Sequence, residues 1–411
     1  MSDRLDVVVV GGGIGGSTLA ANLAQAGLGV ELLERELEFV DRVRGEYIAP
    51  WGVAEAKKLG IYDKLMAAGG HHVTRMINYD ELLTQAQAET NTLSLGNIHP
   101  DAAGPLCMEH VRMQNTLLQH AKACGAKVMR GVSEIAVQAG STPSVTYTHE
   151  GARHARRCRI VVGADGRSST VRRQLGLTLD ENEVDHLMSG LLIEGAHDWP
   201  SDTQALGKAG EVMYFIFPQG SGRIRLYVDY DLADRGRYTG AHGARNLLRA
   251  FDAECLPGGR GIAEATPIGP CRAFPSQDAA LNNPFVEGAI LVGDSAGYTD
   301  PIWGQGLAIT LRDVRLVRDL LIEHQRWSST TFSTYGEERN ERMRRVMCTT
   351  RFATTLFARF DENGIITRAR AMSRMATRPE LGALFMAGLA GPETLPPEVF
   401  TNEFYNAIFA P

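Results

Sequence analysis

A run of four valines leads straight into a glycine-rich turn near the start of the chain. Val7–Val10 precede Gly-Gly-Gly-Ile-Gly-Gly at 11–16, and a second apolar run at 30–34 ends in Glu34. A strand, the pattern G-x-G-x-x-G, a helix and a second strand ending in an acid together form a βαβ dinucleotide-binding unit. The sequence therefore predicts a Rossmann-like domain that binds an adenine dinucleotide.

Each glycine of this turn has a separate physical role. Gly11 permits the tight turn, Gly13 lets the backbone approach a pyrophosphate, and Gly16 lets the helix pack closely against the strand. The pyrophosphate is expected at the helix N-terminus, where unpaired N–H groups favour negative charge. The expected cofactor contacts in this unit are Gly11, Gly13, Ile14, Gly15, Gly16, Glu34 (as acceptor for the ribose) and Arg35.

Composition narrows the class of protein. The 411 residues are 44% hydrophobic and 22% charged, with a net charge of −6, so nothing favours nucleic acid as a partner. No apolar run is long enough to span a membrane, and the N-terminus lacks the pattern of a signal peptide. The six cysteines form no C-x-x-C pair. We expect a cytoplasmic protein with no metal, acting as a monomer or homodimer.

Hydrophobic patterns divide the chain into different kinds of structure. Apolar strands at 5–10, 29–33, 159–162 and 289–292 predict one mostly parallel sheet. Between about 187 and 275 the pattern changes to a small antiparallel sheet, with strands at 191–193, 212–217 and 224–230. Predicted helices cover 51–70, 111–125, 306–323 and most of the chain after 330. The segment 72–108 is predicted to be rich in strands, and 127–137 to hold a pair of strands.

These patterns predict an α/β fold in which the dinucleotide-binding domain is interrupted. We assign residues 1–72, 100–180 and 284–330 to that domain. An inserted β-sheet substrate domain takes 73–99 and 181–283, and a helical region takes 331–411.

Two later motifs follow strands in the same way as the first. Gly163-Ala164-Asp165-Gly166 opens one helix, and Gly293-Asp294 follows the last apolar strand. With the N-terminal glycines, in this order and spacing, the chain resembles the FAD-dependent aromatic hydroxylases, the p-hydroxybenzoate-hydroxylase-like group A flavoprotein monooxygenases. It also shows features of flavin halogenases and geranylgeranyl reductases. The resemblance implies FAD as the cofactor.

The resemblance also implies roles for individual residues. Asp294 is expected to bind a ribityl hydroxyl of FAD, and Gly293 to allow its close approach. Asp165 and Gly166 are implied as contacts to the pyrophosphate region and to NADH or NADPH. Arginines are implied beside FAD at Arg112 and at Arg44, although Arg42 competes with Arg44 for this role. Gly45-Glu46 and Pro50 resemble a segment that lies along the flavin.

A loop at 297–306 feeds the predicted helix 306–323. Gly304 and Gly306 expose N–H groups that can stabilise negative charge on reduced flavin, and Pro301 and Trp303 are expected to wall the ring edge against water. Pro301, Trp303 and Gly304 are the candidate catalytic residues. The loop's expected cofactor contacts are Pro301, Gly304, Gln305, Gly306 and Leu307.

The implied activity is a monooxygenase reaction driven by NADH or NADPH. Oxygen would react at flavin C4a, and one oxygen atom of the resulting hydroperoxide would hydroxylate or epoxidise a small aromatic or unsaturated substrate. Since alternate residues of a strand share a face, the expected substrate contacts are Tyr214, Phe215, Tyr227 and Trp303.

Departures from the hydroxylase pattern keep other functions open. Gly297 replaces the usual histidine, Ala308 replaces an asparagine, and Asp300-Pro301 is typical of halogenases and geranylgeranyl reductases. The halogenase Trp-x-Trp-x-Ile-Pro signature is absent, and the expected lysine position reads Thr74–Asn78, so halogenation is disfavoured. A flavin-dependent reductase of isoprenoid or lipid double bonds stays open, and a non-catalytic NAD-sensing module is disfavoured by the Asp165 and Asp294 motifs.

Overall fold

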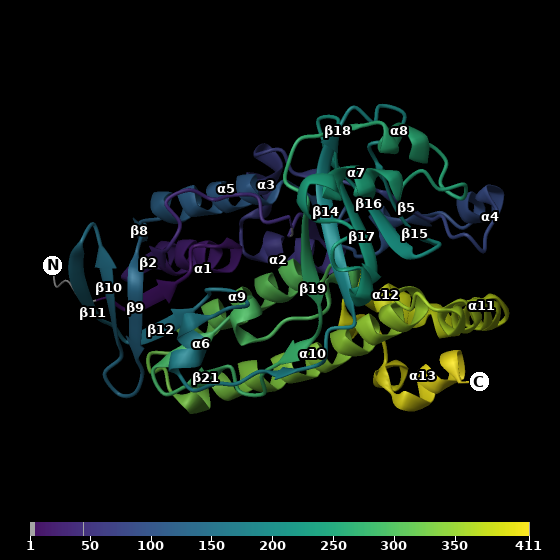
Figure 1. Ribbon diagram of the computed structural model, residues 1–411. Helices are drawn as coiled ribbons and strands as arrows, with labels where there is room; N and C mark the ends of the chain where they lie inside the picture. Colours follow the sequence, from purple (N-terminus) through teal and green to yellow (C-terminus); the bar gives the residue numbers. More distant parts are fainter. Residues whose placement is uncertain (1–4, 44, 411) are drawn as a thin grey trace.

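The computed structural model describes residues 5–43 and 45–410. Two sheets lie at opposite ends of an elongated molecule, and a long helix, α10 (Ser329–Phe357), runs beneath both (Figure 1). Within the described residues, no helix has the length and apolar character needed to cross a membrane.

A six-stranded sheet contains all four strands predicted for the dinucleotide-binding domain. Its order is β21-β22-β12-β1-β2-β8, and only β21 runs antiparallel to its neighbour. All four valines of β1 are buried, as expected of a central parallel strand. The strands are β21 (Phe285–Val286), β22 (Ala289–Leu291), β12 (Ile160–Gly163), β1 (Val7–Val10), β2 (Val30–Glu34) and β8 (Lys127–Arg130).

The strand pair predicted at 127–137 is wrong in one respect. Both strands exist, but β8 pairs with β2 in the parallel sheet, whereas β9 (Ser133–Gln138) pairs with β10 (Ser144–His149). Gly131, with φ +73°, turns the chain between them. With β11 (Ala152–Arg157), β9 and β10 form a separate three-stranded sheet at one end of the molecule (Figure 1).

The helix predicted over 51–70 is divided in two. Pro50 opens α2 (Pro50–Lys58), and Gly60, with φ +68°, ends it before α3 (Tyr62–Ala67) begins. The helices predicted at 111–125 and 306–323 are present as α5 (His110–Ala123) and α9 (Gly306–Glu323). Together with α1 (Ile14–Gln25), these two helices pack against the parallel sheet in one apolar core.

The glycine turn has the packing predicted at Gly11 and Gly16, and it leaves space at Gly13, where the pyrophosphate is predicted. Gly11 has φ +108°, in the region that favours glycine, and lies against the backbone of Ala164. A Cβ on Gly16 would collide with the carbonyl oxygen of Gly11, so the helix can approach the strand only without a side chain. A Cβ on Gly13 would meet no atom within 4 Å. The turn is therefore closed at Gly11 and Gly16 and open at Gly13.

The second sheet has eight strands, seven of them on one path, and is larger than the predicted one. Its order is β18-β14-β17-β16-β15-β5-β6, and β19 also pairs with β14. Most neighbours are antiparallel, but β15 and β5 are parallel. We call it the roof sheet. Its strands are β18 (Thr266–Pro267), β14 (His186–Glu194), β17 (Arg223–Asp231), β16 (Val212–Gly220), β15 (Thr203–Ala209), β5 (Arg75–Asn78), β6 (Leu93–Ser94) and β19 (Arg272–Ser276).

The segment 72–108 is less regular than predicted. It holds short strands and a helix, α4 (Gln85–Thr90), which begins with a capping box at Thr84 and Gln87. Its remaining strands and the other short elements are β3 (Tyr47–Ile48), β4 (His71–His72), β7 (Leu106–Cys107), β13 (Asp180–Glu181), β20 (Ala279–Ala280), α6 (Thr170–Gln174), α7 (Gly243–Arg249) and α8 (Gly259–Ala263).

The chain ends in helices, as predicted. After α10 come α11 (Glu362–Thr377), α12 (Ala383–Ala390) and α13 (Asn402–Phe409), which gather beside the roof sheet (Figure 1). Their apolar side chains share a single core with Phe215 and Tyr227 of the roof sheet and with Trp303. The C-terminal helices therefore support the roof sheet directly.

Replacing Gly16 with alanine should destabilise the apoprotein by about 3 kcal/mol or more, because the new methyl group collides with backbone that cannot rotate away. Urea unfolding of the purified apoprotein measures this loss. Gly13→Ala is the matched control and should be nearly neutral in the same assay, because its φ of −67° is ordinary and its Cβ meets nothing. Equal stability of the two variants would contradict the assigned packing.

Candidate functional site

A cavity of about 310 Å³ lies where the parallel sheet, the roof sheet and the C-terminal helices meet. Three segments far apart in sequence line it: the first glycine turn, the Ala164–Arg167 turn, and the stretch from Val292 to Thr310. Of the residues predicted as sites, the cavity is lined by Gly13, Ile14, Gly15, Gly166, Phe215, Tyr227, Gly293, Asp294, Pro301, Trp303, Gly304, Gln305, Gly306 and Leu307.

The N-terminal end of the cavity suits a phosphate group. Helix α1 starts after Gly13 without a side-chain cap and with no acidic residue in its first turn. Its first N–H groups and its dipole therefore favour an anion, and the space a Cβ of Gly13 would fill is open. These features fit the pyrophosphate of the implied FAD.

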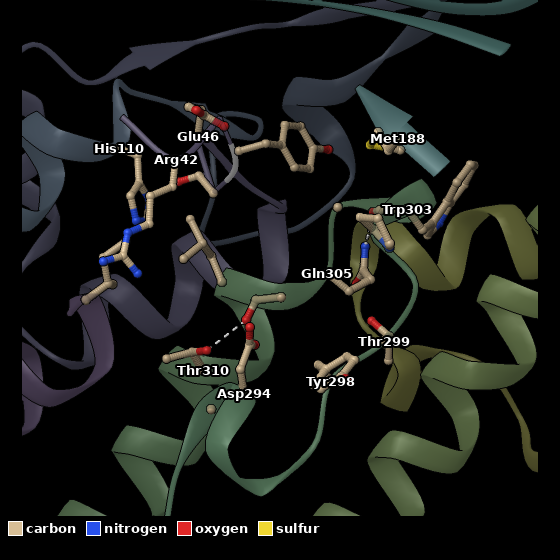
Figure 2. A pocket seen from close by; sticks show the side chains of 18 of the residues that line it. Arg42, Glu46, His110, Met188, Asp294, Tyr298, Thr299, Trp303, Gln305 and Thr310 are labelled. Carbon is tan, nitrogen blue, oxygen red and sulfur yellow. Dashed lines mark hydrogen bonds between the residues drawn. The ribbon is translucent and has the colours of Figure 1, made fainter. Parts of the chain in front are cut away.

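Asp294 also lines the cavity and lies near Thr310 (Figure 2). Its Oδ2 is 3.4 Å from Nε of Arg167, and its side chain is about one third exposed. The backbone N–H of Gly293 donates to Oδ2 of the buried Asp313 at 2.9 Å. Asp313 therefore fixes the turn that presents Asp294.

Asp313 is also the centre of a buried ion cluster. Its two carboxylate oxygens contact Nε of Arg339 at 3.0 Å and an amino group of Arg342 at 2.7 Å. Burial opposes the charged form, but the two guanidinium groups hold the pKa of Asp313 below its ordinary value. Arg339 also donates to the carbonyl oxygen of Gly297 at 3.0 Å. Helices α9 and α10 are thereby tied to both ends of the Gly293–Gly297 turn.

The loop that leads into α9 is held by Gln305. Its Oε1 accepts from the indole N–H of Trp51 at 2.9 Å, and its amide nitrogen donates to the carbonyl oxygens of Trp303 and Gly388. Gly304 has φ +64°, and a Cβ there would collide with the ring of Tyr47. Helix α9 begins at Gly306, where a Cβ would meet nothing within 4 Å. The helix N-terminus therefore opens into the cavity behind a fixed loop (Figure 2).

Two acidic residues predicted to bind the cofactor, Glu34 and Asp165, use both carboxylate oxygens for hydrogen bonds within the protein. Glu34 accepts from the backbone N–H of Gly12 at 2.6 Å and from that of Glu36 at 2.8 Å. Asp165 accepts from the hydroxyl of Ser169 and from the first N–H groups of α6. Neither lines the cavity. Both carboxylates hold turns in place, and Gly166 beside Asp165 is the residue of that motif that reaches the cavity.

Of the arginines predicted to lie beside FAD, two are found outside the cavity. Arg35 pairs with Glu36 and Arg112 with Glu109, and neither lines the cavity. Arg44 lies outside the described residues. Arg42, its competitor for that role, does line the cavity and pairs with Glu36 at 2.8 Å.

The prediction for Tyr214 does not match its position. Adjacent residues of β16 point to opposite faces, so Phe215 and Tyr214 cannot share one. Phe215 lines the cavity with Tyr227, its neighbour across the sheet. Tyr214 is fully buried on the far face, where its hydroxyl donates to the carbonyl oxygen of Tyr79 and its ring packs on Phe251.

Sequence reasoning missed most of the apolar wall. Met76, Met188, Leu206, Phe217, Phe274 and Leu389 line the cavity from five strands and one helix. Period-two alternation could have found Phe217, two residues after Phe215 on the same strand. His110 and Gln114, at the start of α5, also line the cavity, and nothing in the sequence pattern singled them out.

A buried cluster of Tyr227, Glu46 and Arg225 closes one edge of the cavity. The Tyr227 hydroxyl donates to Oε2 of Glu46, and Arg225 contacts Oε1 of Glu46 at 3.0 Å. Arg225 also binds Asp41 at 2.8 Å. Burial and the Glu46 carboxylate raise the pKa of Tyr227 well above its ordinary value, so its hydroxyl keeps its proton. Glu46, on the segment implied to lie along the flavin, is thus held by the roof sheet.

A buried histidine joins the roof sheet to the loop at Pro301. Nε2 of His186 lies 3.0 Å from Asp300 and 3.4 Å from Asp229, and Nδ1 contacts Asp185. Burial opposes the charged form of His186, yet the surrounding carboxylates, Asp229 first, raise its pKa to about 11. Burial in turn raises the pKa of Asp229 above its ordinary value. A protonated His186 therefore links Asp300, the residue before Pro301, to the roof sheet.

His186→Gln should destabilise the protein by about 3–5 kcal/mol at pH 7, since it leaves buried carboxylates without their cation. Because the pKa of His186 is about 11 in the folded protein and 6.5 for an ordinary histidine, the folded state binds the extra proton between these values. Its contribution to the free energy of unfolding is complete below 6.5 and falls as pH rises. The cost of the substitution should therefore shrink between pH 7 and 9.5, as measured by urea unfolding.

The exposed His197 gives the control for this pH series, because His197→Gln should leave stability unchanged at both pH values. A cost of His186→Gln that stays constant or grows towards pH 9.5 would contradict a protonated His186.

Trp303 is wedged between the cavity and α12. Its ring packs edge-on against Phe385 at 4.5 Å, and a Cβ on Gly388 would collide with its indole nitrogen.

Gly388→Ala should therefore destabilise the protein by about 1–3 kcal/mol, and the loss should be largely reversed in the double variant Gly388→Ala/Trp303→Phe. Unfolding in urea tests both.

Gly382→Ala, just before α12, is the matched control, because a Cβ there meets no atom within 4 Å. If Trp303→Phe did not reduce the cost of Gly388→Ala, the contact between Gly388 and Trp303 would not be the cause.

Known proteins resemble the chain over most of its length. It is 26% identical to squalene monooxygenase SE1 of Panax ginseng over 332 residues, covering 77% of this chain but 58% of that protein. It is 24% identical to a 1H-pyrrole-2-carbonyl-[peptidyl-carrier protein] chlorinase of Pseudomonas fluorescens, covering 82% and 80%. The chain spans between half and two thirds of the length of the squalene monooxygenases it matches.

A solved ternary complex of aklavinone-11 hydroxylase with FAD and aklavinone shares the fold, with a TM-score of 0.71 and 19% identity over 86% of this chain and 69% of that one. The family model described as an FAD binding domain matches residues 4–350. Because this match covers most of the chain and includes all three glycine motifs, the protein belongs to that FAD-binding family.

Proposed function

We propose that the protein is an FAD-dependent monooxygenase that uses NADH or NADPH and transfers one oxygen atom from O2 to a small aromatic or unsaturated substrate. The observation that carries this proposal is one cavity with two different ends. A helix N-terminus and glycine backbone form one end, and an aromatic chamber under the roof sheet forms the other, with the Pro301–Leu307 loop between them.

Bound FAD would accept a hydride from the nicotinamide and react with oxygen, which is chemistry that protein side chains do not supply. The residues that would hold it are Gly13 to Gly15 at its phosphates, Gly293 and Asp294 along its middle, and the loop 301–307 at its ring. No predicted site residue is assigned as an acid or base.

The chain's contribution is orientation and exclusion of water. The N-terminus of α9, open at Gly306, presents unpaired N–H groups that favour negative charge at the end of the loop. Gln305 uses its acceptor and both donors on the chain itself, so the loop keeps its shape without a ligand. Trp303 and the apolar wall keep bulk water from the chamber, where it would waste activated oxygen.

The relatives support this proposal and also keep a second one open. Squalene monooxygenases are named for adding oxygen to an unsaturated hydrocarbon, while the chlorinase is named for halogenation. The observations disfavour halogenation. Strand β5 holds no lysine, and the buried Lys208 of β15 does not line the cavity but lies 4.1 Å over the ring of Phe360.

Purified protein reconstituted with FAD should oxidise NADH or NADPH and place one atom of 18O2 in the product, as read by mass spectrometry with 2-naphthol, styrene and squalene as trial substrates.

Gly13→Ala should weaken FAD binding at least tenfold, since its methyl group fills the space expected for the pyrophosphate, while the protein stays folded.

The alternatives give different results in the same assay. Reduced product formed without oxygen would indicate a double-bond reductase, and halogenated product that requires chloride or bromide would indicate a halogenase. Failure to bind FAD in any preparation would end the proposal.

A further inference from the structure

One polar side chain in the apolar chamber has an acceptor without a partner. Gln204, on β15, lines the cavity and is 3% exposed. Its Oε1 has no hydrogen-bond partner among the described residues. A buried carbonyl oxygen without a donor is costly, so its presence in a ligand cavity indicates that a ligand supplies the donor.

Tyr47 stands beside this amide. The Gln204 amide interacts with the Tyr47 hydroxyl, and because Oε1 is unpaired, the amide nitrogen is the group directed at the hydroxyl oxygen. Burial, followed by the effect of nearby Cys107, raises the pKa of Tyr47 above its ordinary value, so the hydroxyl keeps its proton. Gln204 and Tyr47 thus present one acceptor and one neutral donor side by side.

The surroundings of this pair are apolar and aromatic. The ring of Phe217 lies 5.1 Å from that of Tyr47 and stacks against Phe215 at 6.0 Å. Met76 and Leu206 complete the wall on the neighbouring strands. A flat apolar body would fit against these rings, with one polar group directed at Gln204 and Tyr47.

The cations that line the cavity are already paired with acids of the chain. Arg42 contacts Glu36, and Arg167 contacts Asp294. Arg225, behind the wall, is held by Glu46 and Asp41. A carboxylate placed at Gln204 would therefore lose its water without gaining a cation, and the unpaired Oε1 would repel it.

We infer that the substrate is an uncharged, largely aromatic molecule with one neutral donor–acceptor group, a hydroxyl or secondary amide, and that Gln204 and Tyr47 bind that group and determine specificity. The inference rests on the proposed function, because it assigns the substrate to the chamber beside the cofactor. A pure hydrocarbon would leave Oε1 of Gln204 unpaired, and a carboxylic acid would lack a counter-ion.

The test measures binding to the oxidised FAD-loaded protein, read as a change in flavin absorbance, with three matched probes. These are 2-naphthol, its methyl analogue 2-methylnaphthalene, and the anion 2-naphthoate at pH 7.5. The wild type should bind 2-naphthol about tenfold more tightly than 2-methylnaphthalene, a difference of about 1.4 kcal/mol, and 2-naphthoate at least tenfold more weakly than 2-naphthol.

Gln204→Leu and Tyr47→Phe each remove one half of the pair and should each reduce the preference for 2-naphthol to less than threefold. Gln219→Leu is the matched control. Gln219 is also buried with an unpaired Oε1, but it does not line the cavity, so the preference should stay near tenfold. FAD content and circular dichroism establish that each variant is folded and loaded.

Two results would overturn the inference: a full preference for 2-naphthol in both Gln204→Leu and Tyr47→Phe, or equal binding of 2-naphthoate and 2-naphthol by the wild type. The outcomes separate this inference from the proposed function. Selective binding without oxygen transfer would count against the monooxygenase, whereas oxygen transfer without selective binding would count against Gln204 and Tyr47 alone.

Discussion

The site depends on the hydrogen bond and the ion pairs that the buried carboxylate of Asp313 makes. This carboxylate holds the backbone N–H of Gly293 and two guanidinium groups of α10, Arg339 and Arg342. The end of the parallel sheet, the start of the loop at 297–306 and helix α10 are thus joined at one point. Removing either side of such a buried ion pair leaves an uncompensated charge, which costs more than the pair itself contributes. The position of Asp294 and of the loop after it follows from this cluster.

The cavity is closed by parts of the chain that lie far from the glycine motifs in sequence. The roof sheet supplies aromatic and methionine side chains, and α12 supports Trp303 from behind through Phe385 and the bare Cα of Gly388. His186 adds a charged link between the roof sheet and Asp300. A loop fixed from several directions can hold a flat cofactor and keep the chamber dry at the same time, which the proposed oxygen transfer would require.

Local sequence patterns predicted the elements that obey local rules. The four parallel strands, helices α5 and α9, and the helical C-terminus are confirmed, as is the resemblance to the FAD-dependent hydroxylases. Strand β15 was missed because its inward positions hold Gln204 and Lys208, whose burial no hydrophobic pattern signals. The pairing of β8 and β9 was wrong because a turn at Gly131 sends them to different sheets. The domain boundaries and the oligomeric state stay predictions.

The sequence alone determined the dinucleotide-binding unit, because its strand, glycine turn, helix and second strand follow one another within residues 7–34. It also singled out the loop at 297–306, whose residues line the cavity. Only the tertiary structure decided which polar side chains are left for a ligand. Glu34 and Asp165 are used by the backbone, Tyr214 faces away, and Gln204 keeps a free acceptor in the chamber. Hydrogen-bond partners come from segments distant in sequence, so no local pattern can show which groups are already paired.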